Sequence, residues 1–333
     1  MSTVGIIANP ASGKDLRRIV SSGMTVTNQV KENAVQRMLL AMDSLQVQRA
    51  VIMPDRSNLA RRVLDKVSGE VRQLQVSLLE MPYLLGTQDD SVRAAALMVE
   101  QGIDVIIVLG GDGTSRVVSK SCGDVPLVPV STGTNNVFPE MVEGTLVGMA
   151  AAAVATGVVT HEEVCQRAPR LDLYDESGVL VDHALVDIAV IDAMDVAARA
   201  VWEPQRIREL YLTQARVDCI GLAAIGAQVE PLPPYSGKGS RLLLGEGERC
   251  ISAPIAPGLL AELRVKDCRK FEAGERLSIE FSPGVVALDG EREVLLPEGG
   301  QFAVQLNPMG PLVVDIRRSL ELASVRGNRR PSV

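Results

Sequence analysis

A chain of 333 residues is long for one hydrophobic core, so two domains are expected. Hydrophobic residues make up 46% and charged residues 23%, as in an ordinary globular protein, and the net charge of −7 argues against a nucleic-acid-binding surface built on a basic excess. Five cysteines without a C-x-x-C pair and only two histidines argue against a disulfide framework, a zinc site and a histidine-rich metal centre.

The chain opens on a strand pattern rather than on a signal peptide. Its longest weakly polar stretch, 145–159, is too short to span a bilayer. We therefore expect a cytoplasmic protein that binds neither nucleic acid nor a membrane. The sequence leaves the oligomeric state open, a homo-oligomer included.

Strand and helix patterns alternate as far as about residue 160. Strands are predicted at 4–8, 49–53, 74–79, 105–109 and 127–130. Helix patterns lie between them at 34–45, at 57–67 with Ser57 as its cap, at 87–102 behind a capping box of Thr87 and Asp90, after residue 115, and at 145–157. The alternation predicts an α/β domain over residues 1–160, built on an open, doubly wound parallel sheet that binds a nucleotide.

Short strands separated by glycine and proline follow from about residue 170. We predict them at 170–174, 180–190, 240–244, 249–255, 277–281, 285–288 and 301–305, with one or two helices over 193–215 interrupted at Pro204. They indicate a second, mainly antiparallel β domain over residues 161–308 that forms the substrate cleft. A strand at 312–316 and a helix at 317–325, within the segment 309–326, are expected to return to the first domain.

The most informative feature comes directly after the strand 105–109. It consists of Gly110, Gly111, Asp112, Gly113 and Thr114. Glycines allow a backbone to approach phosphate closely, and the N-terminus of the next helix favours anions. The alternative is a plain strand-to-helix turn, but such a turn gains little from a charge at Asp112.

Two more polar loops come after strands of the same predicted sheet. One contains Asn9, Pro10, Ala11, Ser12, Gly13 and Lys14, and the other runs from Ser131 through Gly133, Thr134, Asn135 and Asn136. Because the carboxyl ends of parallel strands lie at one edge, we expect the three loops to form one nucleotide site. Their hydroxyls, amides and lysine suit the acceptor oxygens of a nucleotide.

Two familiar nucleotide motifs do not fit these loops. A P-loop requires glycine where Ala8 stands and Ser or Thr where Asp15 stands, and the dinucleotide fingerprint requires glycine where Arg116 stands. The sequence therefore predicts neither a Walker ATPase nor an ordinary dehydrogenase.

The residues resemble instead the superfamily of NAD kinases, diacylglycerol kinases and sphingosine kinases. The marks are 9–13, 110–114, 133–136 and the triplet Asp289, Gly290, Glu291, in matching order across nearly the whole chain. The segments 6–15 and 199–202 look closest to the AcoX-type branch, ATP-NAD kinase-like proteins associated with acetoin catabolism. The Asn-Glu pair with which NAD kinases hold their substrate is missing here, and the third loop is nearer the lipid-kinase form.

The resemblance implies a kinase that uses ATP with Mg²⁺ and phosphorylates a hydroxyl. Asp112 is the first candidate to orient the metal or activate the hydroxyl, and Asp289 with Glu291 is the second pair. An ordinary hairpin turn is the alternative for Asp289 and Gly290. We expect a soluble small-molecule acceptor, with NAD(H) as one candidate.

Two other classes of protein remain as alternatives. One is a catalytically silent nucleotide-binding accessory or sensor protein, and the other is an NAD(P)-binding oxidoreductase. Asp182, Asp187, Asp192 and Asp195 near His183 could suggest a metal cluster, but alternate residues on a strand point to opposite faces. We interpret these acids as a solvated face or as the lining of the cleft.

Overall fold

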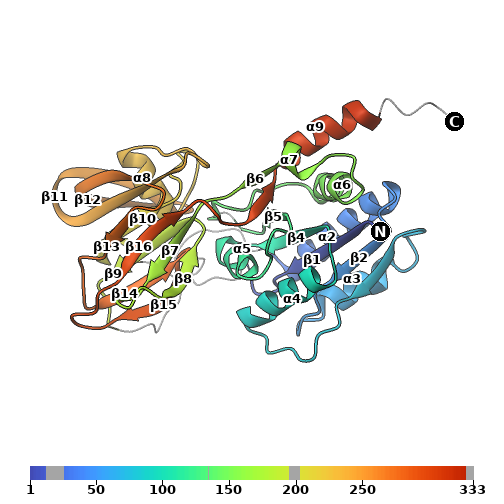
Figure 1. Ribbon diagram of the computed structural model, residues 1–333, viewed down its shortest axis with the longest axis horizontal. Helices are drawn as coiled ribbons and strands as arrows, with labels where there is room; N and C mark the ends of the chain where they lie inside the picture. The colour runs from blue at the N-terminus through green and yellow to red at the C-terminus, as the bar shows by residue number, and fades with distance from the viewer. Residues whose placement is uncertain (13–25, 134, 195–202, 328–333) are drawn as a thin grey trace.

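The computed structural model describes residues 1–12, 26–133, 135–194 and 203–327. Figure 1 shows an elongated molecule with an α/β half and a β-rich half. The α/β half contains a seven-stranded sheet, whose spatial order is β3 (Gln75–Leu78), β2 (Arg49–Ile52), β1 (Thr3–Ala8), β4 (Val105–Gly110), β5 (Leu127–Ser131), β17 (Leu312–Val314) and β6 (Cys165–Arg167). Its first six strands run parallel, and β6 is antiparallel to β17.

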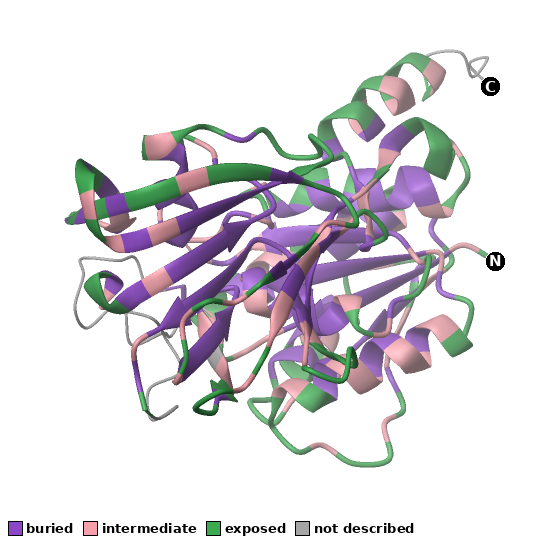
Figure 2. Cartoon of the chain, turned by 60° about the vertical axis from the view of Figure 1, so that its left-hand side comes forward, coloured by how far each residue is buried: buried purple, intermediate pink, exposed green. Residues whose placement is uncertain are grey.

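Helices cover both faces of this sheet. One face packs against α2 (Asn28–Ser44), α3 (Leu59–Val67) and α6 (Gly144–Ala155), and the other packs against α4 (Gln88–Glu100) and α5 (Asp112–Ser119). The short α7 (His161–Val164) leads into β6, and α9 (Ile316–Gly327) packs on α6. The strands β1 and β4 are buried throughout because helices shield both of their faces. Figure 2 shows buried residues in purple in the interior of the molecule. The predicted doubly wound sheet is confirmed.

The β-rich half consists of two antiparallel sheets. The larger has the order β12 (Leu259–Glu272), β11 (Lys238–Ala256), β10 (Ile207–Leu212), β9 (Asp187–Ile191), β14 (Gly284–Leu288) and β15 (Glu291–Leu296). The smaller has the order β13 (Arg276–Ser278), β16 (Ala303–Asn307), β7 (Arg170–Tyr174) and β8 (Leu180–Ala184). A hydrophobic core separates the two sheets, and α8 (Leu222–Val229) covers the other face of the larger one.

Several predicted elements of this half are wrong in detail. The helices expected over 193–215 are replaced, in the described residues from 203 onward, by a 3-10 turn η1 (Pro204–Arg206) and the central strand β10. Burial between β9 and β11 overrides the local helical tendency there. The strands expected at 240–244 and 249–255 form one bulged strand, β11, and the segment 180–190 divides into β8 and β9.

The strand β12 was not predicted although its sequence carries the signal. Ala261, Leu263 and Val265 are buried, whereas Glu262 and Arg264 between them are exposed, which is the period-two pattern of a half-buried strand. Its partner β11 pairs with it over almost its full length. The sequence therefore carries the pattern of a long hairpin, of which the prediction covers only the first strand, β11.

The predicted cap of α3 is wrong, and that of α4 is right in position but not in its capping box. Asn58 rather than Ser57 precedes α3, and the carboxylate of Asp55 accepts from the backbone N–H groups of Leu59 and Ala60. Thr87 does precede α4, but Asp90 reaches back to the N–H groups of Leu85 and Gly86 instead of closing a capping box.

The strand and helix expected near the C-terminus are β17 and α9, and β17 pairs with β5. The domain boundary at residue 160 stays a prediction. In the structure, β6 lies beyond that residue yet belongs to the first sheet. Among the described residues, none of the helices is both long and apolar enough to cross a membrane.

Candidate active site

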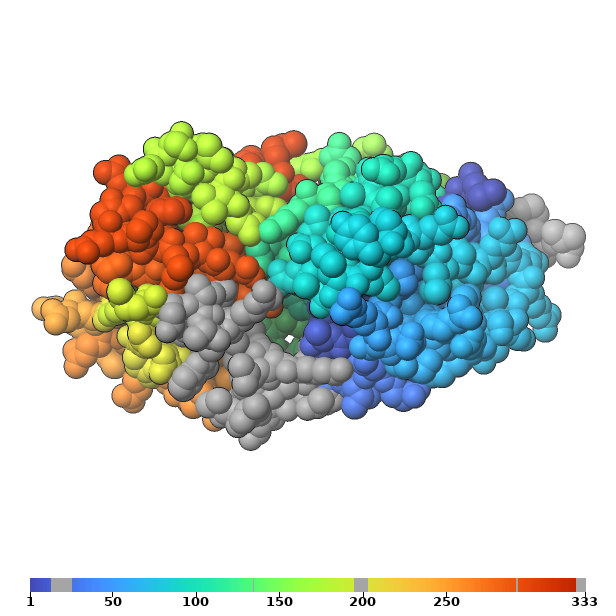
Figure 3. All heavy atoms as spheres, turned by 90° about the horizontal axis from the view of Figure 1, so that it is seen from below, coloured from blue at the N-terminus to red at the C-terminus, as the bar shows by residue number. Residues whose placement is uncertain are grey.

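One cavity of about 650 Å³ lies where the loops after β1, β4 and β5 meet the β-rich half. Viewed from below in Figure 3, the surface is hollowed between these two halves. The predicted site residues that line the cavity are Asn9, Pro10, Ser12, Gly111, Asp112, Gly113, Thr114, Gly133, Asn135, Asn136, Asp289 and Glu291. Gly110 is the buried last residue of β4, and Gly13, Lys14 and Thr134 lie outside the described residues.

The loop after β1 is braced against the glycine turn. Asn9 donates through Nδ2 to Thr114 Oγ1 at 3.0 Å and accepts through Oδ1 from the backbone N–H of Ala11 at 2.9 Å. The hydroxyl of Ser12 donates to the Asn9 carbonyl at 2.7 Å and lies 2.9 Å from the hydroxyl of Thr132. These bonds join all three loops, so the polar edge is a connected unit.

Lys31 supports the same loop from beneath and was missed by the sequence analysis. Only 1% of this side chain is exposed, and its Nζ donates to the carbonyl oxygens of Asn9 at 2.8 Å, Pro10 at 3.3 Å and Ser12 at 2.6 Å. A signal was available, because Lys31 stands four residues before Val35 and seven before Met38 on the buried face of α2.

The glycines of the turn are required by the packing of the protein itself. A Cβ atom on Gly110 would lie 2.4 Å from Thr114 Cβ, one on Gly111 would lie 2.7 Å from Asn136 Oδ1, and one on Gly113 would lie 3.1 Å from Glu291 Oε1. We predicted that these glycines allow the close approach of phosphate. The structure adds that the side chains of Thr114, Asn136 and Glu291 occupy the space beside them.

Asp112, the first residue of α5, is 8% exposed and holds a neighbouring loop. Its Oδ1 accepts from the backbone N–H groups of Val137 at 3.0 Å and Phe138 at 2.8 Å. This carboxylate therefore fixes the segment just after Asn136, in addition to lining the cavity.

Asp289 plays a similar part in the β-rich half. It adopts a left-handed backbone conformation with φ of 50°, and its Oδ1 accepts from the N–H groups of Leu185 at 3.1 Å and Val186 at 2.7 Å. Its Oδ2 lies 3.9 Å from Nε of the fully buried Arg116. Burial raises the pKa of Asp289, while the guanidinium and the backbone N–H groups act in the opposite direction.

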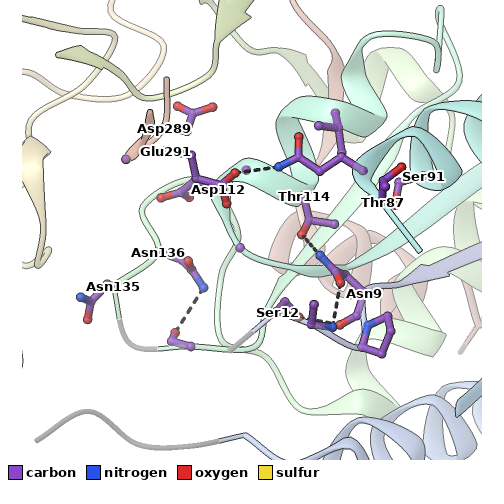
Figure 4. A pocket seen from close by; sticks show the side chains of 18 of the residues that line it. Asn9, Ser12, Thr87, Ser91, Asp112, Thr114, Asn135, Asn136, Asp289 and Glu291 are labelled. Atoms are coloured by element: carbon purple, nitrogen blue, oxygen red, sulfur yellow. Dashed lines mark hydrogen bonds between the residues drawn. The ribbon is translucent and has the colours of Figure 1, made fainter. Parts of the chain in front are cut away.

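Glu291, the first residue of β15, is half-buried and faces the glycine turn. Its Oε2 accepts from Nε2 of Gln88 at 2.7 Å, and Oε1 lies beside Gly113. Figure 4 shows Asp112, Asp289 and Glu291 gathered on one side of the pocket, with Asn9, Ser12 and Thr114 on another. Gln88 had no place in the predicted site, since an uncharged residue in the first turn of a helix carries no signal of a distant partner.

The cavity is suited to phosphate with a divalent cation. The helices α4, α5 and α8 all begin at its wall, and the first N–H groups of a helix have no intrahelical acceptor. Its described lining contains the acids Asp55, Asp90, Asp112, Asp187, Asp289 and Glu291 but only one base, Arg56. No group of three or more acids, histidines or cysteines among the described residues is placed to hold a metal alone. Mg²⁺ needs only one or two carboxylates when phosphates and waters complete its shell, so the residues fit Mg²⁺-ATP.

The acids near His183 have different partners and do not form one metal-binding cluster among the described residues. Asp182 pairs with Arg116 and Lys120, Asp187 lines the cavity, and Asp192 pairs with Arg208. Asp195 lies outside the described residues. His183 shares a hydrogen bond of 2.7 Å with the hydroxyl of Ser119 on α5.

Comparison with known proteins first defines the class. Residues 4–162 match the family model of the ATP-NAD kinase N-terminal domain, so the α/β half is that of an NAD kinase-like protein. Residues 169–309 match the model of the acetoin catabolism protein X C-terminal domain.

A full-length relative then gives the family. Acetoin catabolism protein X of Cupriavidus necator is 36% identical over 323 residues, covering 94% of this chain and 90% of the relative. The chain belongs to the acetoin catabolism protein X family. The predicted resemblance to NAD kinases, with the AcoX-type branch indicated by segments 6–15 and 199–202, is confirmed.

Proposed function

We propose that this protein is a phosphotransferase that uses ATP and Mg²⁺ to phosphorylate a hydroxyl of a soluble small molecule. The observation that carries the proposal is the position of Glu291. It comes from the β-rich half, yet its carboxylate lies against Gly113 of the glycine turn and accepts a hydrogen bond from Gln88 of α4. Both Glu291 and Gln88 line the cavity of about 650 Å³. A carboxylate at such a junction can face the reacting groups of two substrates bound from opposite sides.

The three acids have different tasks in this proposal. Glu291 takes the proton of the acceptor hydroxyl, while the new bond forms between that oxygen and the terminal phosphorus of ATP and the bond to ADP breaks. Asp112 would hold the metal, and it fixes the loop at Val137 and Phe138. Asp289 anchors the turn that presents Glu291, through its bonds to Leu185 and Val186.

The nucleotide contacts are assigned to the three loops. We propose that the terminal phosphates lie near the N-terminus of α5 and are bounded by the turn 110–114, with the loops 9–14 and 133–136 along the rest of the nucleotide. A cytoplasmic location accords with the use of ATP and with scattered, unpaired cysteines.

The acceptor is the finer part of the proposal. The absent Asn-Glu pair argues for an acceptor other than NAD, and the polar lining argues for a soluble metabolite over a lipid. NAD and NADH stay in the test panel because the α/β half matches the ATP-NAD kinase model.

A catalytically silent nucleotide-binding accessory or sensor protein is the second candidate. One observation favours it: Asp112 and Asp289 accept hydrogen bonds from backbone N–H groups. The fold would therefore need both residues even in a protein that catalyses no reaction. The oxidoreductase alternative has no such support, because Arg116 replaces the third glycine of the fingerprint and is wholly buried.

The test is Glu291→Gln, with Glu298→Gln as its control. Glu298 is an exposed residue in the turn after β15, so its substitution should leave turnover unchanged. Product formation from ATP and Mg²⁺ with NAD, NADH, polyols and sugars would be measured, together with ATP binding by calorimetry. We expect Glu291→Gln to retain ATP binding and to lose roughly a hundredfold in kcat.

Either of two results would count against the proposal. Full turnover in Glu291→Gln would remove Glu291 from the reaction. ATP binding by the unmodified protein without product from any acceptor would favour the silent, nucleotide-sensing reading.

A further inference from the structure

A cluster of buried charges joins α5 to the β-rich half behind the cavity. Arg116 is fully buried, and its Nη1 lies 2.9 Å from Asp182 Oδ2 while its Nη2 lies 3.0 Å from Glu293 Oε1. Lys120, the residue that follows α5 directly, also pairs with Asp182 at 2.8 Å. One cation lies on α5 and the other at its C-terminal cap, and all their carboxylate partners belong to β8, β15 or the turn before β15.

Two acids of β15 contact successive turns of α5. Glu291 lies beside Gly113, and two residues further along the strand Glu293 binds Arg116, three residues further along the helix. Residues three apart in a helix lie on neighbouring positions of one face, so Gly113 and Arg116 face β15 from the same side of α5. The pairing of β15 with β14 shifts register between Arg292 and Val294, and Glu291 and Glu293 both contact α5.

We propose that Arg116 is the positioning residue that sets the register of β15 against α5 and so holds the Glu291 carboxylate at the glycine turn. A planar guanidinium can engage Asp182 and Glu293 at the same time through separate nitrogens. A lysine keeps the charge but cannot hold both carboxylates in that fixed geometry. The inference rests on the proposed function for its catalytic consequence, whereas the register itself is a property of the fold.

The decisive substitution is Arg116→Lys, and Arg241→Lys is its matched control. Arg241 is also a buried arginine between two carboxylates, Glu209 and Glu280, each 2.9 Å away, but it lies wholly within the β-rich half and away from the cavity. We expect Arg116→Lys to lower kcat roughly tenfold with the KM for ATP changed less than about twofold, and Arg241→Lys to leave both constants unchanged.

A second measurement distinguishes positioning from general damage. In the Glu291→Gln background, Arg116→Lys should cause no further loss of kcat, because it acts through the residue already removed. Amide hydrogen exchange should become faster in 291–296 for Arg116→Lys, with no change for Arg241→Lys. If Arg116→Lys does not fold, Glu293→Gln is the substitute, because it removes one of the ion pairs of Arg116 at a side chain that is 22% exposed. We expect the same changes in kcat and in amide exchange.

The outcomes separate this inference from the proposed function. Unchanged exchange in 291–296 and unchanged kcat for the Arg116 variant would overturn it, as would fully additive losses with Glu291→Gln. If the unmodified protein phosphorylates no acceptor, the proposed function has failed, and amide exchange in 291–296 alone tests the role of Arg116. Faster exchange in Arg116→Lys then supports the register set by Arg116. Unchanged exchange overturns this inference.

Discussion

Two acid-containing glycine turns lie beside each other in the wall of the cavity, one at residues 110–114 and the other at 289–291. In each, the leading aspartate is used to hold another segment of backbone: Asp112 binds the N–H groups of 137 and 138, and Asp289 binds those of 185 and 186. The two turns lead into different elements. The first continues into the helix α5, whereas the second presents Glu291 to that helix from the edge strand β15.

The difference shows that a carboxylate beside glycine need not be the reacting group. Asp289 has no exposed side-chain surface, and Asp112 is 8% exposed, so both are placed chiefly for their hydrogen bonds to backbone. Glu291 accepts from a side chain and remains half-buried at the pocket. The comparison can be tested by substitutions whose effects on stability and on turnover diverge.

The largest effect on stability is expected for Asp289→Asn. The substitution removes a carboxylate that accepts buried backbone N–H groups and faces Arg116, so we expect the free energy of unfolding to fall by about 3 kcal/mol or more. Denaturant titration would measure it beside Glu291→Gln, which we expect to stay within about 0.5 kcal/mol of the unmodified protein. Equal losses of unfolding free energy in the two variants would contradict the assignment of Asp289 as an anchor and Glu291 as the reacting acid.

A smaller loss, about 2 kcal/mol, is expected for Asp112→Asn. An amide in this place retains one acceptor oxygen but brings an N–H group toward the backbone donors of Val137 and Phe138. Asp124→Asn is the control, since Asp124 is 84% exposed and pairs only with Arg167 among the ion pairs described. An unfolding midpoint identical to that of the control would show that Asp112 does not anchor the loop.

Gly111→Ala tests whether the first turn is packed against its neighbour as closely as the structure shows. The new methyl group would lie 2.7 Å from Asn136 Oδ1, and we expect a loss of about 1 to 2 kcal/mol. Asn136→Ala in the same chain should recover part of it by removing the obstacle. Gly69→Ala, which meets nothing within 4 Å, serves as the neutral control. No recovery in the double variant would mean that the loss has another cause.

The smallest effect concerns pH and the packing of α5 against β8. Burial lowers the pKa of His183 to about 4, with Arg170 acting in the same direction and Asp182 and Asp172 opposing it. Because the unfolded chain binds a proton near pH 6.5 and the folded chain does not, this contribution is complete above that pH and is lost as the pH falls toward 4. At pH 5.5 the loss is about 1 kcal/mol. Unfolding of His183→Gln should show a flatter pH dependence between about pH 7 and pH 5; an unchanged slope would contradict the assignment.

Much of the α/β half could be predicted because its signals are local. The β-branched runs at 105–109 and 127–130 can be buried on both faces only in a parallel sheet covered by helices, and β4 and β5 lie there. The β-rich half was harder. The segment 207–212 resembles a helix until its neighbours β9 and β11 are known, and strand pairing over long sequence separations leaves little trace in either segment alone.

The amino-acid sequence by itself determined the family, the parallel sheet and the gathering of polar loops at one sheet edge, because each depends on short motifs and on the rule that parallel strands end on the same side. Only the tertiary structure decided what each acid contacts. Asp112, Asp289 and Glu291 are alike in sequence as carboxylates beside glycine. Their partners, among them Val137, Leu185, Arg116 and Gln88, come from distant segments. The contacts with Arg116 and Gln88 exist only once the two halves have packed together.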